Sequence, residues 1–350
     1  MGKRAAIAGA VVLTAAVLWL VFKSYTDPIL APNSVAKLHV IAVNGDRQWL
    51  LERGCDRSRP VLLFLHGGPG MSAMYLAHSF ARRLERDFVV VQWDQRGAGK
   101  SFHADLDPGT MTFTQMQADA LAVVNYLRRT YGADRIFLVG HSYGSFLGAH
   151  LAAAHPELFY AFVGVGQDAD RPAEHAAQEA LIKGALGVQQ VVTGANREEL
   201  LFRAHGELAA STSMWPLIAT GLMAPEYSLK DALNVAKGPS FARKHLKYDI
   251  PGGYGPPPDR FAVPVYVVMG KGDMVTPVSL ARTWFDRVQA PKKTWFDVAG
   301  AAHFPHYEQP EAFARIMRQV RSDTLGPDGN GTVKAWPIPR FGLQCRGGRS

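Results

Sequence analysis

The chain has 350 residues, of which 47% are hydrophobic and 19% are charged, so it can form one large core or a core with an inserted domain, and it is not a disordered chain. Its formal net charge of +8 suggests a nucleic-acid-binding surface, but residues 1–23 and residues 324–350 each carry +3, which leaves +2 on the body. The body has no Lys/Arg cluster with interleaved aromatic residues, so nucleic acid is excluded as a predicted partner.

Residues 5–22 form an uncharged apolar run of 18 residues, flanked by Lys3, Arg4 and Lys23. A run of this length is at the lower end of what spans a bilayer. No small-x-small cleavage site follows closely, which favours an uncleaved signal anchor over a signal peptide. Residues 1–23 are therefore predicted to anchor the protein as a single-pass membrane helix, with the rest of the chain on the extracytoplasmic side. The alternative is a secreted or periplasmic protein after signal cleavage.

Residues 35–51 open the body with two β-rich runs separated by Asn44-Gly45, a strong signal for a tight antiparallel hairpin. Short, nearly continuous apolar runs then alternate with helical sequence. This pattern is typical of strands buried on both faces of a mostly parallel sheet, and it predicts an α/β fold. The apolar runs are residues 61–66, 88–93, 135–140, 161–166, 263–270 and 294–298.

Residues 167–261 break this rhythm, because they hold Ala/Leu-rich helical sequence and no strand that fits the series. An insertion of this length is a domain rather than a loop. It leaves from the carboxyl end of a strand, where the ligand crevice of an open parallel sheet lies. We therefore expect a helical cap that acts as a lid over a core formed by residues 24–166 and 262–323. Residues 324–350 are glycine-rich without apolar periodicity and are expected to be a disordered tail.

The sequence Gly140-His141-Ser142-Tyr143-Gly144 matches the G-x-S-x-G nucleophile elbow. One such match is a weak signal in a chain with 34 glycines. Here, however, an apolar strand runs into the motif and a small-residue helix follows it, as the elbow requires. Ser142 is therefore predicted to be a nucleophile, and the other interpretation is an ordinary strand-to-helix cap.

A serine nucleophile needs a base, and the base needs an orienting acid, in the chain order Ser, acid, His. Asp273 and His303 each follow a later strand and fit this order, and Asp168 is the alternative acid. His306 competes with His303 for the role of base. The small residues before His303 let its loop approach the elbow, whereas His306 is expected at the surface.

The sequence His66-Gly67-Gly68-Pro69-Gly70 follows an apolar strand and offers unobstructed backbone N–H groups. Two such donors are needed to stabilise a developing oxyanion. We predict that they come from Gly68, with Gly67 as the alternative, and from Tyr143, the residue after the nucleophile. His66 is interpreted as a structural residue beneath the glycine turn.

The segment from Asp94 to Ser101 ends in Gly-Lys-Ser and resembles a phosphate-binding loop. That motif requires glycine at the position of Asp94, where a carboxylate would repel a phosphate. An ATP-dependent protein is therefore excluded. No metal or organic cofactor is implied by any other motif.

Together, HGGPG, WDQRGAGKS, GHSYGS, GKGD and GAAHF resemble the proline iminopeptidase-like branch of the α/β-hydrolases over about residues 35–320. The resemblance implies an α/β-hydrolase fold with a helical cap, whose best-known members use cap glutamates to bind the substrate's free amine. The family's Trp-x-x-Trp-Glu-like cap stretch is missing here, since Trp215 is followed by Pro216 with no glutamate nearby. The possible substitutes are Glu174, Glu179 and Glu226, and the alternative interpretation is that these are solvated helix carboxylates.

The predicted function is that of a serine hydrolase that cleaves an amide or ester of a small molecule or short peptide through an acyl-enzyme. An aminopeptidase-like activity is favoured, and a carboxylesterase or lactonase is the alternative. Epoxide hydrolase or dehalogenase chemistry is disfavoured, because members of the fold with that chemistry look to use Asp in place of Ser at the elbow. The alternative of another class is a non-catalytic ligand-binding protein with the same fold.

Overall fold

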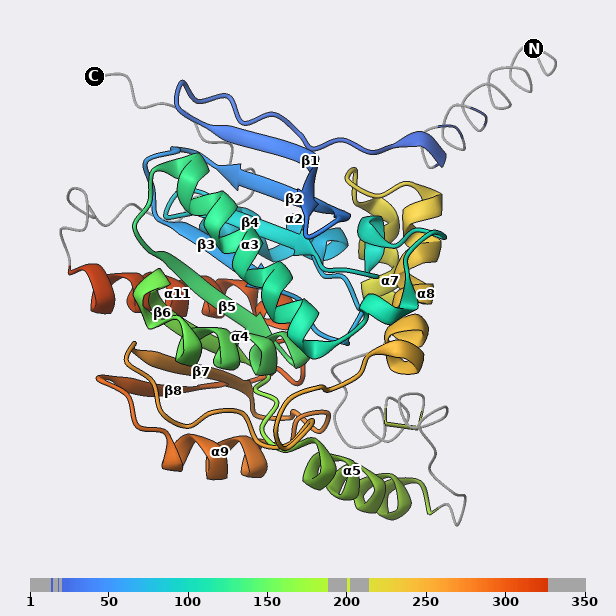
Figure 1. Cartoon of the computed structure of the whole chain (residues 1–350), viewed down its shortest axis with the longest axis vertical. Coiled ribbons are helices and arrows are strands. Elements are labelled where there is room, and N and C mark those ends of the chain that lie inside the picture. The colour runs from blue at the N-terminus through green and yellow to red at the C-terminus, as the bar shows by residue number, and fades with distance from the viewer. Residues whose placement is uncertain (1–13, 15–17, 19–20, 188–199, 202–213, 327–350) are drawn as a thin grey trace, which may run out of the picture.

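The computed structural model describes residues 14, 18, 21–187, 200–201 and 214–326. Within these residues, one sheet has the strand order β1-β2-β4-β3-β5-β6-β7-β8 (Figure 1). The β1–β2 and β2–β4 pairs are antiparallel, and the other pairs are parallel. The prediction of a mostly parallel sheet with an N-terminal antiparallel hairpin is confirmed. The strands are β1 (Val35–Val43), β2 (Asp46–Gly54), β3 (Val61–Leu65), β4 (Val89–Asp94), β5 (Ile136–His141), β6 (Phe159–Val165), β7 (Val265–Gly270) and β8 (Lys293–Val298).

The β1–β2 hairpin turns at Asn44 and Gly45, which have φ angles of 45° and 79°. Positive φ at both central residues gives a two-residue turn whose twist matches the twist of the flanking strands. Val43 pairs with Asp46 directly across this turn. The Asn-Gly pair therefore fixes the register of the hairpin.

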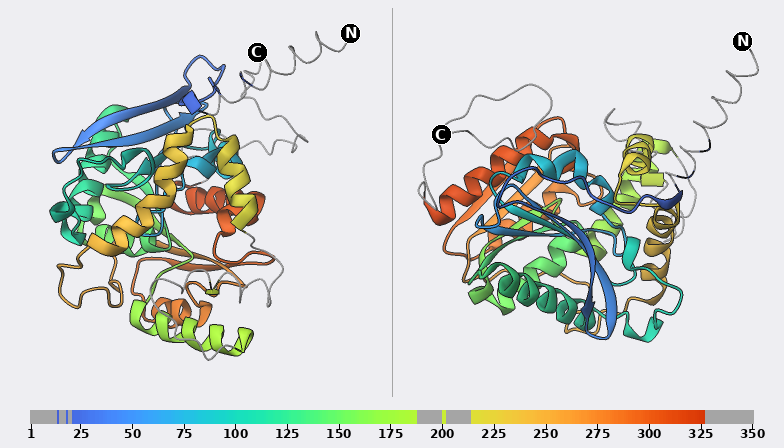
Figure 2. Two further views of the ribbon diagram at one scale, coloured as in Figure 1. Left: turned by 90° about the vertical axis from the view of Figure 1, so that its right-hand side faces the viewer. Right: turned by 90° about the horizontal axis from the view of Figure 1, so that it is seen from above.

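Helices cover both faces of the sheet (Figures 1 and 2). Because both faces are covered, the central strands consist of nearly continuous apolar residues. The buried side chains of α3 (Phe113–Tyr131), α4 (Tyr143–Ala154) and α9 (Val278–Arg287) form one hydrophobic cluster on the sheet. A second cluster contains side chains of η1 (Met74–Leu76), α2 (Ala77–Phe80), η2 (Ala81–Leu84) and α11 (Pro310–Leu325). Short connecting helices are η3 (Gly99–Ser101), η4 (Pro108–Thr110), η5 (Pro156–Leu158) and α10 (Pro305–Glu308).

Helix α3 shows how local sequence sets the helix ends. The Thr112 hydroxyl accepts a hydrogen bond from the Gln115 N–H (3.1 Å) and caps the N-terminus. Gly132 ends the helix in the left-handed conformation, with φ of 61°, where a side chain would cost energy. Buried residues such as Met116, Ala120 and Val123 recur every three or four positions and face the sheet.

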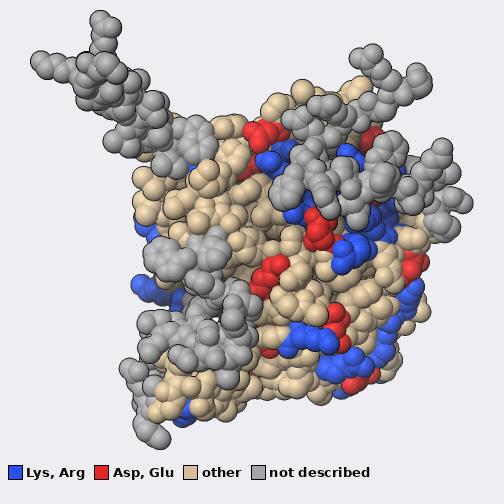
Figure 3. Space-filling view, turned by 180° about the vertical axis from the view of Figure 1, so that it is seen from behind, with Lys and Arg blue, Asp and Glu red and all other residues tan. Residues whose placement is uncertain are grey.

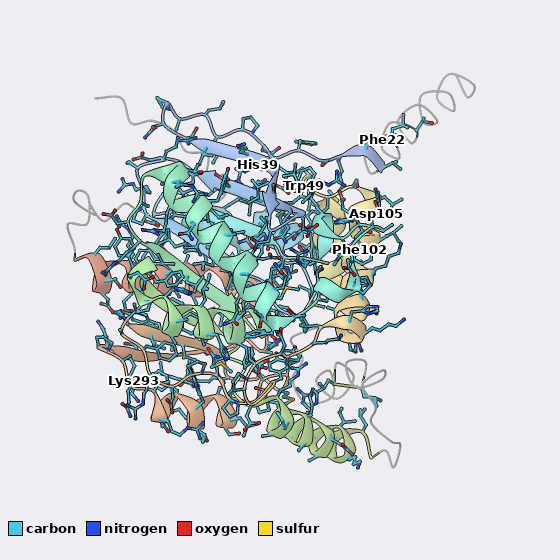
Figure 4. All side chains as sticks on the ribbon, viewed as in Figure 1. Phe22, His39, Trp49, Phe102, Asp105 and Lys293 are labelled. Carbon is cyan, nitrogen blue, oxygen red and sulfur yellow. The ribbon has the colours of Figure 1, made fainter. Side chains whose placement is uncertain are left out.

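The segment between β6 and β7 contains helices and no named strand among its described residues. Its helix α8 is held against the loop after β4. The ring of Phe102, labelled in Figure 4, packs edge-on against Phe241 with centroids 5.4 Å apart, and the Asn234 side chain donates to the Phe102 carbonyl (3.2 Å). Parts of the predicted cap and tail, namely residues 188–199, 202–213 and 327–350, lie outside the described residues. The helices of this segment are α5 (Arg171–Leu186), α7 (Met214–Met223) and α8 (Leu229–His245).

Asp94, at the end of β4, links the core to this inserted segment. Its buried carboxylate accepts hydrogen bonds from the Lys100 N–H (2.7 Å) and from the hydroxyls of Ser72 and Tyr227. Tyr227 lies between α7 and α8, so this bond crosses from the sheet to the insertion. A Cβ atom on Gly99 would lie 2.3 Å from Asp94 Oδ2. The Gly-Lys-Ser loop therefore folds around a carboxylate rather than around a phosphate.

We expect the buried Asp94 to make folding stability depend on pH. Burial raises the pKa of Asp94 from 3.8 to about 6, although hydrogen bonds from Ser72 and Tyr227 oppose this shift. The folded chain then retains a proton that the unfolded chain loses above about pH 4. The stabilising contribution of this proton is present in full below about pH 4 and is lost as the pH rises through about 6. The total loss in the free energy of unfolding is about 3 kcal/mol.

The measurement compares Asp94→Asn with the unchanged protein by denaturant unfolding at pH 4 and pH 7. Between pH 4 and pH 7, the free energy of unfolding should fall by less in the variant than in the unchanged protein. An identical pH dependence in both proteins would contradict the assignment to Asp94.

Residues 23–27 form a strap that packs against the inserted segment before β1 begins. The Thr26 hydroxyl donates to Glu226 (3.1 Å), and the buried ammonium of Lys23 donates to the Leu222 carbonyl. Glu226 is therefore bound by the N-terminal part of the chain.

The predicted membrane localisation is wrong. Among the described residues, no helix is long and apolar enough to cross a membrane, and most of residues 5–22 lie outside the described part of the chain. A run of 18 apolar residues reaches only the lower limit of a span. In addition, Lys23, which would flank such a span, is buried against Leu222 of α7. The anchor and the extracytoplasmic placement are therefore not retained.

Charged side chains of both signs alternate on the face shown in Figure 3. Ion pairs such as Arg83 with Glu311 (2.6 Å) and Lys292 with Asp323 (2.8 Å) bring opposite charges together. Among the described residues of this face, no large patch of one sign is visible. This agrees with the nearly neutral body of the sequence.

Candidate active site

Ser142 lies in a sharp turn between β5 and α4. Its φ of 53° and ψ of −126° are unusual for a residue with a side chain. A Cβ atom on Gly140 would lie 2.1 Å from the Gly144 carbonyl oxygen, and a Cβ atom on Gly144 would lie 2.3 Å from the Leu65 carbonyl oxygen. Only glycine fits at these two positions. The turn holds Ser142 at the wall of a cavity of about 310 Å³.

His303 and Asp273 form a buried pair after β8 and β7. The Nδ1 atom of His303 lies 3.0 Å from Oδ2 and 3.1 Å from Oδ1 of Asp273. The same carboxylate accepts hydrogen bonds from the backbone N–H groups of Val275 and Thr276 (both 2.9 Å) and from the Thr276 hydroxyl (2.8 Å). These bonds fix the carboxylate. With Nδ1–H donating to it, the imidazole presents Nε2 as its proton acceptor.

The loops that carry these residues meet at the carboxyl ends of parallel strands (Figure 1). Ser142 and His303 line the same cavity. Gly166, at the end of β6, allows the close approach, because a Cβ atom there would lie 3.2 Å from His303 Nδ1 and 3.3 Å from Asp273 Oδ2. The φ of Gly166 is 52°, a second reason for glycine at this position.

His141, inside the elbow motif, was not indicated by the sequence patterns. Its Nε2 lies 2.8 Å from the His303 carbonyl oxygen and donates to it. Burial, together with the nearby rings of His306 and His303, holds the pKa of His141 well below its ordinary value. A neutral His141 therefore ties the elbow to the loop of His303.

His306 is buried, with 1% of its surface exposed, and the prediction that it lies at the surface is wrong. The short helix α10 directs its ring between Phe64 and Phe80, with centroids 5.2 Å and 4.8 Å away. Burial lowers the pKa of His306 to about 3. Neither ring nitrogen has a hydrogen-bond partner among the described residues. The ring therefore serves as a neutral packing element beside the cavity.

The glycine loop after β3 lies against the elbow. Gly67 and Gly68 line the cavity, and a Cβ atom on Gly67 would lie only 3.0 Å from Ser142 Cβ. Tyr143 begins α4, and the first N–H groups of a helix have no partner within the helix. The predicted oxyanion donor Gly68 thus lies in a loop that lines the same cavity as Ser142, and the other, Tyr143, begins the helix that follows Ser142.

His66 satisfies both of its ring nitrogens within the protein. Nδ1 lies 2.9 Å from the Gly67 carbonyl oxygen, and Nε2 accepts from the Gln95 N–H (3.1 Å). Burial lowers the pKa of His66 to about 4. This placement matches the structural role predicted for it.

The three glutamates suggested for substrate binding are not among the described residues that line the cavity. Glu226 contacts the strap, and Glu179 pairs with Lys183 (2.7 Å) on the outer side of α5. Glu174 is buried, and its Oε1 accepts from the Ala169 N–H (2.8 Å). The description as a solvated helix carboxylate therefore fits only Glu179.

The inserted segment supplies wall residues that no motif indicated. These residues are polar, basic or aromatic and stand at positions without a characteristic spacing. Only the folded insertion brings them together, so sequence patterns offered no signal for them. They include Arg171, His175 and Gln178 from α5, Arg243 from α8, and Tyr248 and Tyr254 from the loop that follows.

Comparisons with known proteins agree with this architecture. The family model described as alpha/beta hydrolase fold matches residues 60–310. The chain is 28% identical over 306 residues to a Bacillus subtilis protein named probable aminopeptidase YbaC, covering 81% of this chain and 96% of that protein. The crystal structure of proline iminopeptidase from Mycobacterium smegmatis has a TM-score of 0.61 and 20% identity, and the match covers 83% of this chain and 100% of that structure.

A proline iminopeptidase from Thermoplasma volcanium is 32% identical over 100 residues, which are 29% of this chain and 32% of that protein. At 20% identity, the likeness to the Mycobacterium smegmatis structure shows the fold alone. The resemblance to the proline iminopeptidase-like proteins is confirmed, and the relatives support an aminopeptidase-like hydrolase.

Proposed function

Because the chain belongs to the α/β-hydrolase family, we propose that it is a serine hydrolase that cleaves an amide or ester through an acyl-enzyme at Ser142. The observation that carries this proposal is the strained elbow of Ser142 beside the His303–Asp273 pair. Such a nucleophile, base and orienting acid are what acyl transfer requires. The relatives named as aminopeptidases favour an amide as the bond that is cleaved.

In the proposed reaction, Ser142 Oγ attacks the substrate carbonyl carbon while His303 Nε2 accepts the hydroxyl proton. Asp273 orients the imidazole and stabilises the imidazolium that forms. The N–H groups of Gly68 and Tyr143 stabilise the oxyanion. The imidazolium then gives its proton to the leaving amine or alcohol. Water, deprotonated by His303, releases the acid product and restores Ser142.

The cavity supports a small substrate. At about 310 Å³, it is at the lower end of the range for small-molecule sites. A short peptide or a single aminoacyl amide fits this size. An ester or lactone remains the second candidate, because the same elbow and base would cleave it by the same steps.

A fluorophosphonate probe tests the proposed nucleophile directly. We expect covalent labelling of the native protein at Ser142 and none after replacement of that serine. A panel of aminoacyl amides and simple esters then identifies the bond that is cleaved. Hydrolysis of the panel by a protein that the probe does not label would contradict the acyl-enzyme mechanism.

We expect Asp273→Asn to lower kcat by about 10⁴, because the asparagine amide favours the wrong imidazole tautomer. Asp168→Asn, at the alternative acid, should change kcat on a neutral ester by less than about tenfold, since Asp168 is not bonded to the imidazole. Steady-state kinetics on one ester measure both effects. A larger loss in Asp168→Asn would transfer the orienting role to Asp168.

A further inference from the structure

Arg171, the first residue of α5, brings a guanidinium group to the wall of the cavity that Ser142 lines. The group lies over the ring of Tyr254, 5.5 Å from its centroid. Its Nη1 is 3.8 Å from Asp168 Oδ2 and also 3.8 Å from Glu174 Oε2. These distances are too long for hydrogen bonds. The two carboxylates therefore hold the guanidinium in place without using its N–H donors.

The two carboxylates behind Arg171 are buried and only partly hydrogen-bonded. The Tyr254 hydroxyl donates to Asp168 Oδ2 (2.6 Å), whereas Asp168 Oδ1 and Glu174 Oε2 have no hydrogen-bond partner among the described residues. Burial raises the pKa of Glu174 well above its ordinary value, and the nearby Asp168 adds to the effect. Burial raises the pKa of Asp168 as well. The pair therefore favours carrying fewer than two negative charges.

Arg171 itself stays charged. Burial acts to lower its pKa, but Tyr254, Asp168 and Glu174 raise the pKa above its ordinary value overall. The cavity consequently faces a charged guanidinium group, and the two acids that pair with it do not line the cavity.

Arg171 and Arg243 bring guanidinium side chains to the described wall of the cavity, and no described aspartate or glutamate lines it. At Arg171, a substrate ammonium would meet like charge, whereas a carboxylate would be attracted. Arginine also presents its donors as a planar fork that matches both oxygens of a carboxylate.

We propose that Arg171 binds a carboxylate group of the substrate, so that the enzyme prefers amides or esters that carry a free carboxylate over otherwise equal neutral ones. This inference rests on the proposed serine hydrolase activity of the same site and names its substrate class. A carboxylate beside Tyr254 would complete the hydrogen bonding of the guanidinium, which Asp168 and Glu174 leave open.

Three aryl esters of equal length test the proposal: one with a neutral end, one with a terminal carboxylate and one with a terminal ammonium. The unchanged protein should have a higher kcat/KM on the carboxylate ester than on the neutral ester, and the ammonium ester shows whether the effect follows the sign of the charge. Arg171→Gln should lower kcat/KM on the carboxylate ester by about 10- to 100-fold, mainly through KM, as for a lost charge-assisted hydrogen bond. On the neutral ester, the change should stay within about threefold.

Two further variants separate charge recognition from folding. Arg171→Lys keeps the charge but not the fork and should retain part of the preference. If Arg171→Gln does not fold because it leaves buried acids unpaired, the double variant Arg171→Gln/Glu174→Gln removes one of those acids. Arg282→Gln, which alters an arginine paired with Asp286 on the exposed side of α9, is the matched control and should change none of the three values.

The outcomes are distinguishable. Equal losses on all three esters in Arg171→Gln would assign a structural role and overturn the proposal. A kcat/KM on the carboxylate ester no higher than on the neutral ester in the unchanged protein would also overturn it, while fluorophosphonate labelling of Ser142 would leave the hydrolase mechanism standing. Failure of both labelling and ester hydrolysis would overturn the proposed function and this inference together.

Discussion

Replacing Ser142 with alanine is expected to lower kcat by about 10⁶, since removal of the nucleophile of a serine triad has an effect of this size. The fold should remain intact, because alanine removes only the hydroxyl from a residue at the cavity wall and leaves the close contacts of Gly140 and Gly144 unchanged. Ester hydrolysis and thermal unfolding measure the two properties. Retention of more than a few per cent of the activity would remove Ser142 from the mechanism.

Ser79→Ala is a matched control for this experiment. The Ser79 hydroxyl donates to the Leu76 carbonyl (2.6 Å) in α2 and does not line the cavity. The variant should keep both its activity and its fluorophosphonate labelling. Loss of labelling in Ser79→Ala would show that the probe reports on general damage rather than on the nucleophile.

His303→Ala should lower kcat by about as much as loss of the serine, about 10⁶, because the base and the nucleophile act as one unit. The neighbouring His306→Leu should retain most of the activity. His306 is neutral, buried and without a described hydrogen-bond partner, so leucine removes no described hydrogen bond and leaves an apolar side chain between Phe64 and Phe80. Kinetics on a neutral ester compare the two variants, and the reverse order of effects would exchange the roles of the two histidines.

The sheet and the elbow were predictable from sequence because their causes are local. A strand buried on both faces must be apolar along its whole length, as β3 and β5 are. Gly140 and Gly144 are required by clashes of about 2 Å with nearby backbone atoms, and such steric demands leave a fixed spacing in the sequence. The order of Ser142, Asp273 and His303 followed from the same architecture.

The rest of the site depends on contacts between segments that are far apart in the sequence. Such contacts do not produce a motif with a fixed spacing, so the sequence alone does not reveal them. Glu226 was one candidate for a cleft carboxylate, but Thr26 of the strap, 200 residues earlier in the chain, bonds to it. His306 was expected at the surface, but its position on α10 places its ring against Phe80. Arg171 and Tyr254 come from separate parts of the insertion and meet at the cavity wall only in the folded chain.

The strap of residues 23–27 couples the N-terminal end of the chain to the insertion mechanically. Arg53 Nη1 donates to the Thr26 hydroxyl and to the Asp27 carbonyl (2.5 Å and 2.6 Å), which fastens the strap to β2. Thr26 is bonded at the same time to Glu226, which lies between α7 and α8. A purification tag, a fusion partner or a surface tether joined directly before residue 23 would therefore pull on residues that bond to α7 and to the segment between α7 and α8. Because α8 also lines the cavity, the length and stiffness of such an attachment should be kept constant when turnover is compared.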